Sequence, residues 1–282
     1  MSAVLHRIRS APRTRPRLGV VDVLALGVLA LVALAIVAPG VLAPADPLEA
    51  VPGGTLQPPG SAGLFGTDYL GRDVLSRIVH GTGRTVLASS IAVAIGLGAG
   101  SALGLIAAYF GGWADAVVSR VVDVLLSIPG LLLSMVVVVA LGFGSTNAAI
   151  AVGVASIAAF ARLMRSEVLR VRELGFVESA RHLGVRPWAV LLRHVLPNSA
   201  APVLSMTALQ FGNAILWIAA LSFLGYGAPP PLPEWGLLVS EGRGYLSSSP
   251  WLTLLPGLVI VATVVAISRV SALIAETRRT RP

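Results

Sequence analysis

Six long apolar runs constrain the fold of this chain more than any other feature. They cover residues 23–43, 86–110, 124–144, 146–161, 199–226 and 245–268. A membrane-spanning helix needs about 20 consecutive, mostly apolar residues. Most of the runs reach that length, and the shorter fourth run is expected to continue through Arg162 toward the membrane surface. The sequence therefore predicts an all-α protein with six transmembrane helices.

The composition agrees with a membrane location. Hydrophobic residues make up 55% of the 282 residues and charged residues only 12%, whereas a soluble domain carries about 25% charged residues. The first run follows a basic segment, as in a secretory signal peptide, but it exceeds the about 7–15 apolar residues of such a peptide. We therefore expect it to be retained as the first span.

Two residue types are absent from the sequence, and their absence excludes several kinds of chemistry. Without cysteine, the chain has no disulfide, thiolate nucleophile or cysteine-ligated metal. All 21 basic residues are arginine, so the phosphate-binding lysine of a P-loop is missing. The sequence also lacks hydrolase motifs, and its histidines lack metal-ligand spacing. We expect no catalytic residue, no metal site and no cofactor.

The arginines predict the orientation of the spans. Five lie in residues 1–19, seven lie between the fourth and fifth spans, and three lie in the last five residues, whereas acidic residues outnumber arginines in the loops before the second and sixth spans. Loops rich in arginine face the cytoplasm. We expect a basic cytoplasmic tail (1–19), a transmembrane domain (20–268) and a second cytoplasmic tail (269–282). The net charge of +8 then indicates membrane lipid rather than nucleic acid as a partner.

The second span carries a regular stripe of small residues. Gly96, Gly100 and Gly104 recur every four residues, so they lie on one face of a helix. Such a stripe lets the backbone of another helix approach closely. The sequence predicts a tight helix pair at this face.

The third span contains a proline and a pair of opposite charges. Pro129 lies inside the run, and a proline removes an intrahelical hydrogen-bond donor. We expect a bend there. Arg120 and Asp123 lie three residues apart near the start of the span and are expected to form an ion pair.

Helix-breaking residues divide the coupling segment, residues 165–200, between the fourth and fifth spans. Gly175 offers a break, Gly184 is suited to the position after a helix end, and Pro187 is suited to a first helical turn. The sequence predicts a short amphiphilic helix at about 176–183 that projects from the cytoplasmic face. The alternative is an arginine-rich loop that lies on anionic lipid.

The order of residues in this segment favours the helix. Residues 178–184 read Glu-Ser-Ala-Arg-His-Leu-Gly, and a Leu-Pro follows at 196–197. This pattern resembles the EAA loop of bacterial ABC importer permeases. Further motifs at 65–77, 109–113, 196–198, 221–225 and 233–236 resemble the C-type permease subunits of the dipeptide, oligopeptide and nickel importers. The resemblance covers residues 20–268, and the basic C-terminal tail departs from it.

The resemblance implies a non-catalytic permease subunit in the bacterial plasma membrane, with both termini cytoplasmic. Such a subunit pairs with a second homologous permease and receives di- or oligopeptides from an extracytoplasmic substrate-binding protein. Cytoplasmic ATPase subunits supply the energy, which agrees with the missing P-loop lysine. The residues that the resemblance assigns to ATPase coupling are Glu178, Ser179, Ala180, Arg181 and Gly184.

Two other functions compete with this interpretation. A permease of the same architecture can carry nickel or another small solute. A secondary carrier is a different class of protein, and it requires ionisable groups near the middle of the membrane. The middles of the six runs contain none, which favours the ABC permease.

Polar residues in the fifth span are candidates for the translocation pathway. Gln210 and Asn213 lie three residues apart on one helical face. A peptide needs hydrogen bonds for its amide groups when it leaves water, and these two side chains can supply them. Hydrogen bonding between helices by the same amides is the alternative.

The loop before the second span has two interpretations as well. Asp68, Arg72 and Asp73 are candidates for contact with the substrate-binding protein. The same residues, with the glycines between them, are also what a tight turn and a helix start require.

Overall fold

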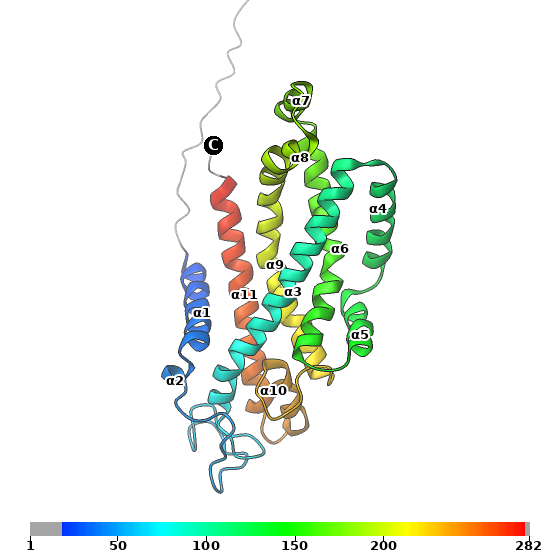
Figure 1. Ribbon diagram of the computed structural model, residues 1–282. Helices are drawn as coiled ribbons and strands as arrows, with labels where there is room; N and C mark the ends of the chain where they lie inside the picture. The colour runs from blue at the N-terminus through cyan, green and yellow to red at the C-terminus, as the bar shows by residue number, and fades with distance from the viewer. Residues whose placement is uncertain (1–18, 280–282) are drawn as a thin grey trace, which may run out of the picture.

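Every regular element in the described part of the chain is a helix. The computed structural model describes residues 19–279, and the predicted all-α fold is confirmed (Figure 1). Five helices are long and apolar enough to cross a membrane, and a bent pair of shorter helices makes a sixth span. The long helices are α1 Val20–Val37, α3 Val74–Phe110, α6 Ser145–Arg172, α9 Leu196–Phe223 and α11 Trp251–Arg279.

The long helices lie side by side in a bundle with two different ends. One end, the α7 end, carries α7 Gly175–His182 and α8 Pro187–Val190; the other, the α10 end, carries α10 Trp235–Gly242 and the loop at residues 43–73 (Figure 1). Helix α1 begins and α11 ends at the α7 end. The chain therefore runs the length of the bundle an even number of times, as six spans require.

Several helices begin or end away from the limits of the apolar runs. The first span is helical from Val20 and stops at Val37, because Pro39 starts the separate helix α2 Pro39–Leu42. The second span begins at Val74, 12 residues before the run at 86–110. There the Asp73 carboxylate caps α3 by accepting a hydrogen bond from the Ser76 amide at 2.7 Å.

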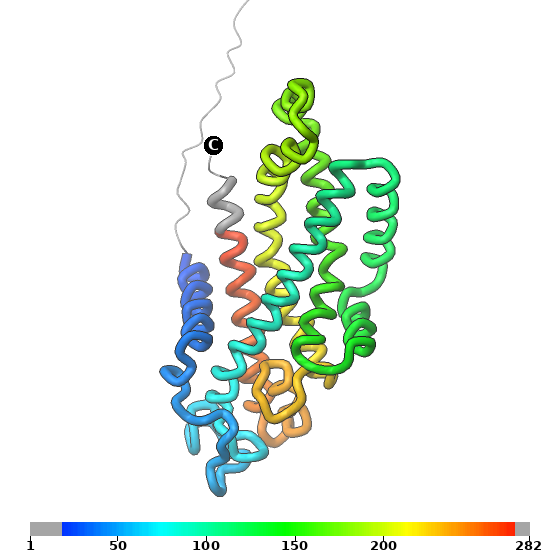
Figure 2. Tube along the Cα trace, in the orientation of Figure 1, coloured from blue at the N-terminus to red at the C-terminus, as the bar shows by residue number. Residues whose placement is uncertain are grey.

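The expected third helix at 124–144 is wrong as a single element. It consists of α4 Gly112–Ser127 and α5 Gly130–Leu141, which meet at an angle of 98°. The trace in Figure 2 passes from α4 into α5 through a non-helical stretch. The cause is Pro129, which stands at the N-cap of α5 with extended backbone. The predicted bend is therefore present, as a complete break.

The expected ion pair inside this span is also wrong. Asp123 pairs with Arg162 of α6 at 2.5 Å instead of with Arg120. Asp115 of α4 pairs with Arg165 of α6 through two hydrogen bonds of 2.7 and 2.8 Å. Two arginines of α6, one turn apart, thus hold α4 against the bundle. Residue spacing within one helix cannot predict such a contact between helices.

The chain enters the fifth span without a helix break. Helix α8 continues through a π-helical turn at Leu191–Val195 directly into α9, and Pro197 and Pro202 both lie within α9. A π-helical turn changes the local hydrogen-bond pattern. The result is one continuous rod from Pro187 to Phe223.

Helices α3 and α6 are in tight contact, and the predicted glycine stripe forms this contact. A Cβ added at Gly96 would stand 2.8 Å from Cβ of Ser156, and one added at Gly100 would stand 2.5 Å from the carbonyl oxygen of Ile157. A Cβ at Gly104 would meet the carbonyl oxygen of Ala161. The prediction of a tight pair is confirmed, because no larger residue fits at these positions.

This packing predicts a sharp difference between two glycines of α3. Gly100 is buried against α6, whereas Gly98 is exposed and a Cβ there meets nothing within 4 Å. We expect Gly100→Ala to lower the stability by about 1–3 kcal/mol, because α3 and α6 must separate. Gly98→Ala should be neutral or stabilising, since alanine favours the helix by up to about 1 kcal/mol. Thermal unfolding in detergent measures both, and equal midpoints for the two variants would contradict the tight contact.

Candidate functional site

Helix α7 is a short helix held between two well-defined ends. At its start, the carbonyl of Leu174 accepts hydrogen bonds from the amides of Val177 and Glu178 at 2.9 and 3.2 Å. At its end, the amide of Gly184 donates to Arg181 at 3.0 Å and the amide of Val185 donates to Ala180 at 3.2 Å. These last two bonds form a Schellman motif, the usual end of a helix at a glycine.

Gly184 has the conformation that the sequence predicts. Its φ is +76°, in the left-handed region, and a Cβ there would meet no atom within 4 Å. A substitution at Gly184 is therefore opposed by the backbone conformation alone, at about 1–2 kcal/mol. Pro187 then starts α8, also as predicted.

The inner face of α7 packs on the extension of α6 and on the rod that leads into α9. Val177 and Ala180 are buried. Their partners in one apolar cluster are Met164, Val168, Val171, Val190, Leu191 and Val195. Ala180 therefore points into the bundle, whereas the other four residues assigned to coupling are exposed.

Tyr109 of α3 fixes the base of this region, and it is a functional candidate that reasoning on the coupling segment missed. Its hydroxyl donates to the carbonyl oxygen of Pro187 at 2.8 Å, and the guanidinium of Arg181 lies 5.2 Å from its ring centroid. Arg172 donates to the carbonyl oxygen of Ala108, one residue before Tyr109, at 2.7 Å. The motif at 109–113 was the sequence signal for this contact.

The outer face of α7 is polar and open. Glu178, Ser179, Arg181 and His182 are exposed, and Leu183 at the tip is 84% exposed. Glu178 and His182 approach each other to 3.7 Å, but their side chains are 68% and 80% exposed, so this pair contributes little to folding. The face carries both charges and an apolar tip, which suits a contact with another protein.

The two polar residues of α9 pair with each other. The side-chain amide of Asn213 donates to Oε1 of Gln210 at 2.9 Å. Gln210 is buried and Asn213 is half-buried. This bond lies within one helix and therefore does not link α9 to another helix, which was the alternative role for the two amides. Their role in the translocation pathway stays a prediction.

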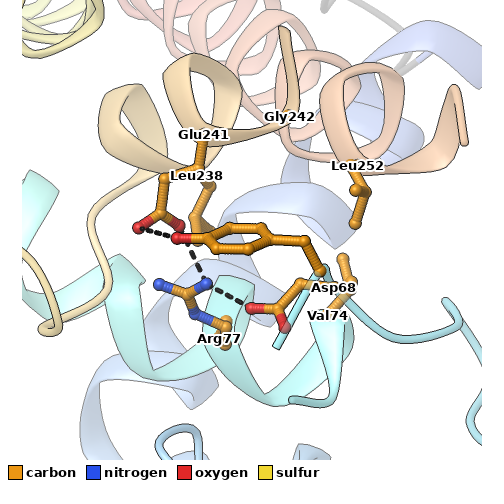
Figure 3. A pocket seen from close by; sticks show the side chains of 8 residues that line it. Asp68, Val74, Arg77, Leu238, Glu241, Gly242 and Leu252 are labelled. Atoms are coloured by element: carbon orange, nitrogen blue, oxygen red, sulfur yellow. Dashed lines mark hydrogen bonds and ion pairs between the residues drawn. The ribbon is translucent and has the colours of Figure 1, made fainter. Parts of the chain in front are cut away.

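At the α10 end, Asp68 and Arg72 lie inside a buried ion network. Oδ2 of Asp68 accepts from Nε of Arg72 at 2.7 Å and from Nη1 of Arg77 at 2.6 Å. Arg77 also reaches Oε2 of Glu241 on α10 at 2.8 Å, and Figure 3 shows it between the two carboxylates. Asp68 and Arg72 are each 4% exposed. They join the loop to α3 and α10 and do not present their charges at the surface.

The network balances two carboxylates with two guanidinium groups around a cavity of about 20 Å³. The hydroxyl of Tyr69 lies 3.4 Å from Oε1 of Glu241. Burial raises the pKa of Tyr69 and the Glu241 carboxylate raises it further, so the hydroxyl stays protonated. Removing one partner of such a network leaves an unpaired buried charge and costs about 3–5 kcal/mol.

Glu234, a buried carboxylate outside this network, was also missed as a site residue. Its oxygens accept from the hydroxyls of Ser222 and Ser145, each at 2.8 Å, which joins the loop before α10 to α9 and to the first residue of α6. The indole of the next residue, Trp235, donates to the carbonyl oxygen of Ile78 at 3.1 Å. Both residues belong to the motif at 233–236.

Comparison with known proteins agrees with these features. Residues 100–280 match the family model described as "Binding-protein-dependent transport system inner membrane component". The glutathione transport system permease protein GsiD of Pectobacterium atrosepticum is 43% identical over 208 residues, which are 74% of this chain and 69% of that protein. The dipeptide transport system permease protein DppC of Alkalihalophilus pseudofirmus is 40% identical over 222 residues, 79% and 73% of the two chains.

Solved structures share the fold at low sequence identity. A chain of the MetNI methionine ABC transporter, in an inward-facing conformation, superposes with a TM-score of 0.60 at 18% identity and covers 73% of this chain and 97% of its own. An amino acid ABC transporter gives a TM-score of 0.57 at 16% identity, with 71% and 94% covered. The family match and the relatives confirm the resemblance that the sequence motifs indicated: the chain belongs to the binding-protein-dependent transport system inner membrane components, the permease subunits of ABC importers.

Proposed function

We propose that this chain forms part of the translocation pathway of an ABC importer for di- and oligopeptides. The observation that carries the cargo class is the identity of 40–43% with permeases named for dipeptide and glutathione transport. The pair of amides at Gln210 and Asn213 supports it, because backbone-like groups of a peptide can exchange hydrogen bonds with such a pair.

ATPase subunits dock on the outer face of α7 in this proposal. Glu178, Ser179 and Arg181 are available to a partner, whereas Ala180 and Gly184 set the position and the end of the helix. ATP hydrolysis belongs to the partner, since a chain without lysine lacks the phosphate-binding residue of a P-loop. A second homologous permease completes the pathway, and a substrate-binding protein delivers the cargo at the α10 end.

The buried ion network changes the proposed contact with the binding protein. In this proposal Asp68 and Arg72 do not touch the binding protein. They fix the shape of the loop that contacts it, and Asp73 caps the start of α3. Exposed residues of the same loop, such as Leu64 and Leu70, are then the ones that touch the partner.

The α7 end faces the cytoplasm of a bacterial cell in this proposal. The exposed residues around α7 include Arg170, Arg181, Arg186 and Arg193, and such loops stay in the cytoplasm. Both termini then lie on the cytoplasmic side, although the tail residues 1–18 and 280–282 are outside the described residues.

Reporter fusions test this orientation. A reporter that is active only in the cytoplasm should be active after Arg172 or Arg281 and silent after Gly60 or Glu241, because the first two sites follow arginine-rich segments and the others do not. The measurement is reporter activity at matched protein abundance. Activity after Gly60 would overturn the orientation.

Two substitutions in α7 test the docking of the ATPase. Gly184→Val distorts the end of α7, and Glu178→Arg reverses an exposed charge. We expect each to lower the recovery of co-purified ATPase and peptide uptake by about tenfold, as a loss of 1.4 kcal/mol in binding implies. Insertion and pairing with the second permease should persist, because neither side chain is packed in the bundle.

Matched controls separate docking from folding. Gly225, like Gly184, has a left-handed backbone, with φ of +90°, and a Cβ there would meet no atom within 4 Å. Gly225→Val therefore imposes the same backbone strain, but at the α10 end. Glu49→Arg reverses the charge of an exposed glutamate in the loop at that end. Both should keep ATPase recovery at the wild-type level. Wild-type uptake by the two α7 variants would show that α7 is only a lipid-facing segment.

A further inference from the structure

The break between α4 and α5 lies directly against the ring of Trp217 on α9. Gly130 is the first residue of α5. A Cβ at this position would overlap Cη2 of Trp217 and stand 2.8 Å from Cζ3. The backbone of the break and the six-membered part of the indole ring are therefore in close contact, which only a glycine permits.

The break exposes irregular backbone within a membrane span. Residues 126–129 are all exposed in this chain. Non-helical backbone at membrane depth is stable only where protein buries it or where it lines a water-filled cavity, because lipid offers no hydrogen bonds. Lipid therefore does not cover the exposed side of the break.

Trp217 shares a helical face with the amide pair. It follows Asn213 by four residues and Gln210 by seven, spacings of about one and two turns. All three are at least half-buried. At a rise of about 1.5 Å per residue, the ring lies about 10 Å from Gln210 along α9, toward the α10 end. One face of α9 thus presents hydrogen-bonding groups next to a large apolar ring.

We propose that Trp217 and the break at residues 127–130 form a constriction of the translocation pathway, and that the ring limits the size of the cargo side chains that pass. This inference rests on the proposed function. In the constriction, the amide pair bonds the cargo backbone while the indole ring occupies the space that a large side chain needs. Trp217 is then a residue that determines specificity.

Labelling tests the position of the constriction and requires no knowledge of the cargo. The chain has no cysteine, so single cysteines can be introduced without background labelling of this subunit. In the assembled transporter, Ser127→Cys and Asn213→Cys should react with a charged, membrane-impermeant thiosulfonate reagent. Leu31→Cys should not react, because Leu31 lies on the membrane-spanning helix α1, away from the break, although it is 57% exposed in this chain. Protection of both Ser127→Cys and Asn213→Cys would show that the second permease covers the break, and it would overturn the proposal.

Uptake tests the role of the ring. Trp217→Ala should raise the uptake of triphenylalanine relative to trialanine by about tenfold, because small differences in pocket volume give effects of this size. The uptake ratio of Trp217→Phe should lie between those of the wild type and Trp217→Ala. Equal ratios for all three proteins at matched membrane abundance would contradict the size limit. If the wild type takes up neither peptide, the proposed cargo is wrong, while the labelling still decides where the pathway lies.

A double variant separates the ring contact from general damage. Gly130→Ala should lower uptake, since its Cβ displaces the ring, and Gly98→Ala should not, because Gly98 faces open space. In the background of Trp217→Ala, the change Gly130→Ala should have no further effect, as expected for two residues in direct contact. If the effects of the two substitutions on uptake add in the double variant, the contact between Gly130 and the ring of Trp217 is not the cause of the lower uptake.

Discussion

The close contact between α3 and α6 is the interaction on which the rest of the structure depends. Three glycines of α3 let the backbone of α6 approach so closely that no side chain fits between the two helices at these positions. Helix α6 then continues to Arg172, and its last turns supply Val168 and Val171 to the apolar seat of α7. A packing contact between two spans thus fixes the position of the short helix at the α7 end.

The two ends of the bundle are held by different physical means. At the α7 end, apolar packing and single hydrogen bonds, such as that from Tyr109 to Pro187, hold a small helix whose outer face stays free. At the α10 end, Asp68 and Glu241 are balanced by Arg72 and Arg77 in a network of buried charges. Buried charges require exact partners, so this end is fixed in shape, which suits a surface that receives another protein.

The features that follow local rules could be predicted from the sequence. Gly175, Gly184 and Pro187 limit α7 because helix ends depend on neighbouring residues, and the spacing of the α3 glycines alone indicates a helix contact. The rest depends on residues far apart in the chain. Tyr69 and Glu241 are 172 residues apart and Arg162 lies 39 residues from Asp123. Periodicity carries no information on such pairs, so the burial of Asp68 was not foreseen.

The proposed docking of an ATPase on α7 can act on the spans only if α7 moves as one body with α3 and α6, against which it packs. Spin labels on Ser179→Cys of α7 and Leu103→Cys of α3, both exposed positions, measure this by double electron–electron resonance in the assembled transporter. The account predicts one narrow distance that is the same in the resting and the ATP-trapped states. A distance that shifts or broadens between the two states would contradict it, because α7 would then move independently of the bundle.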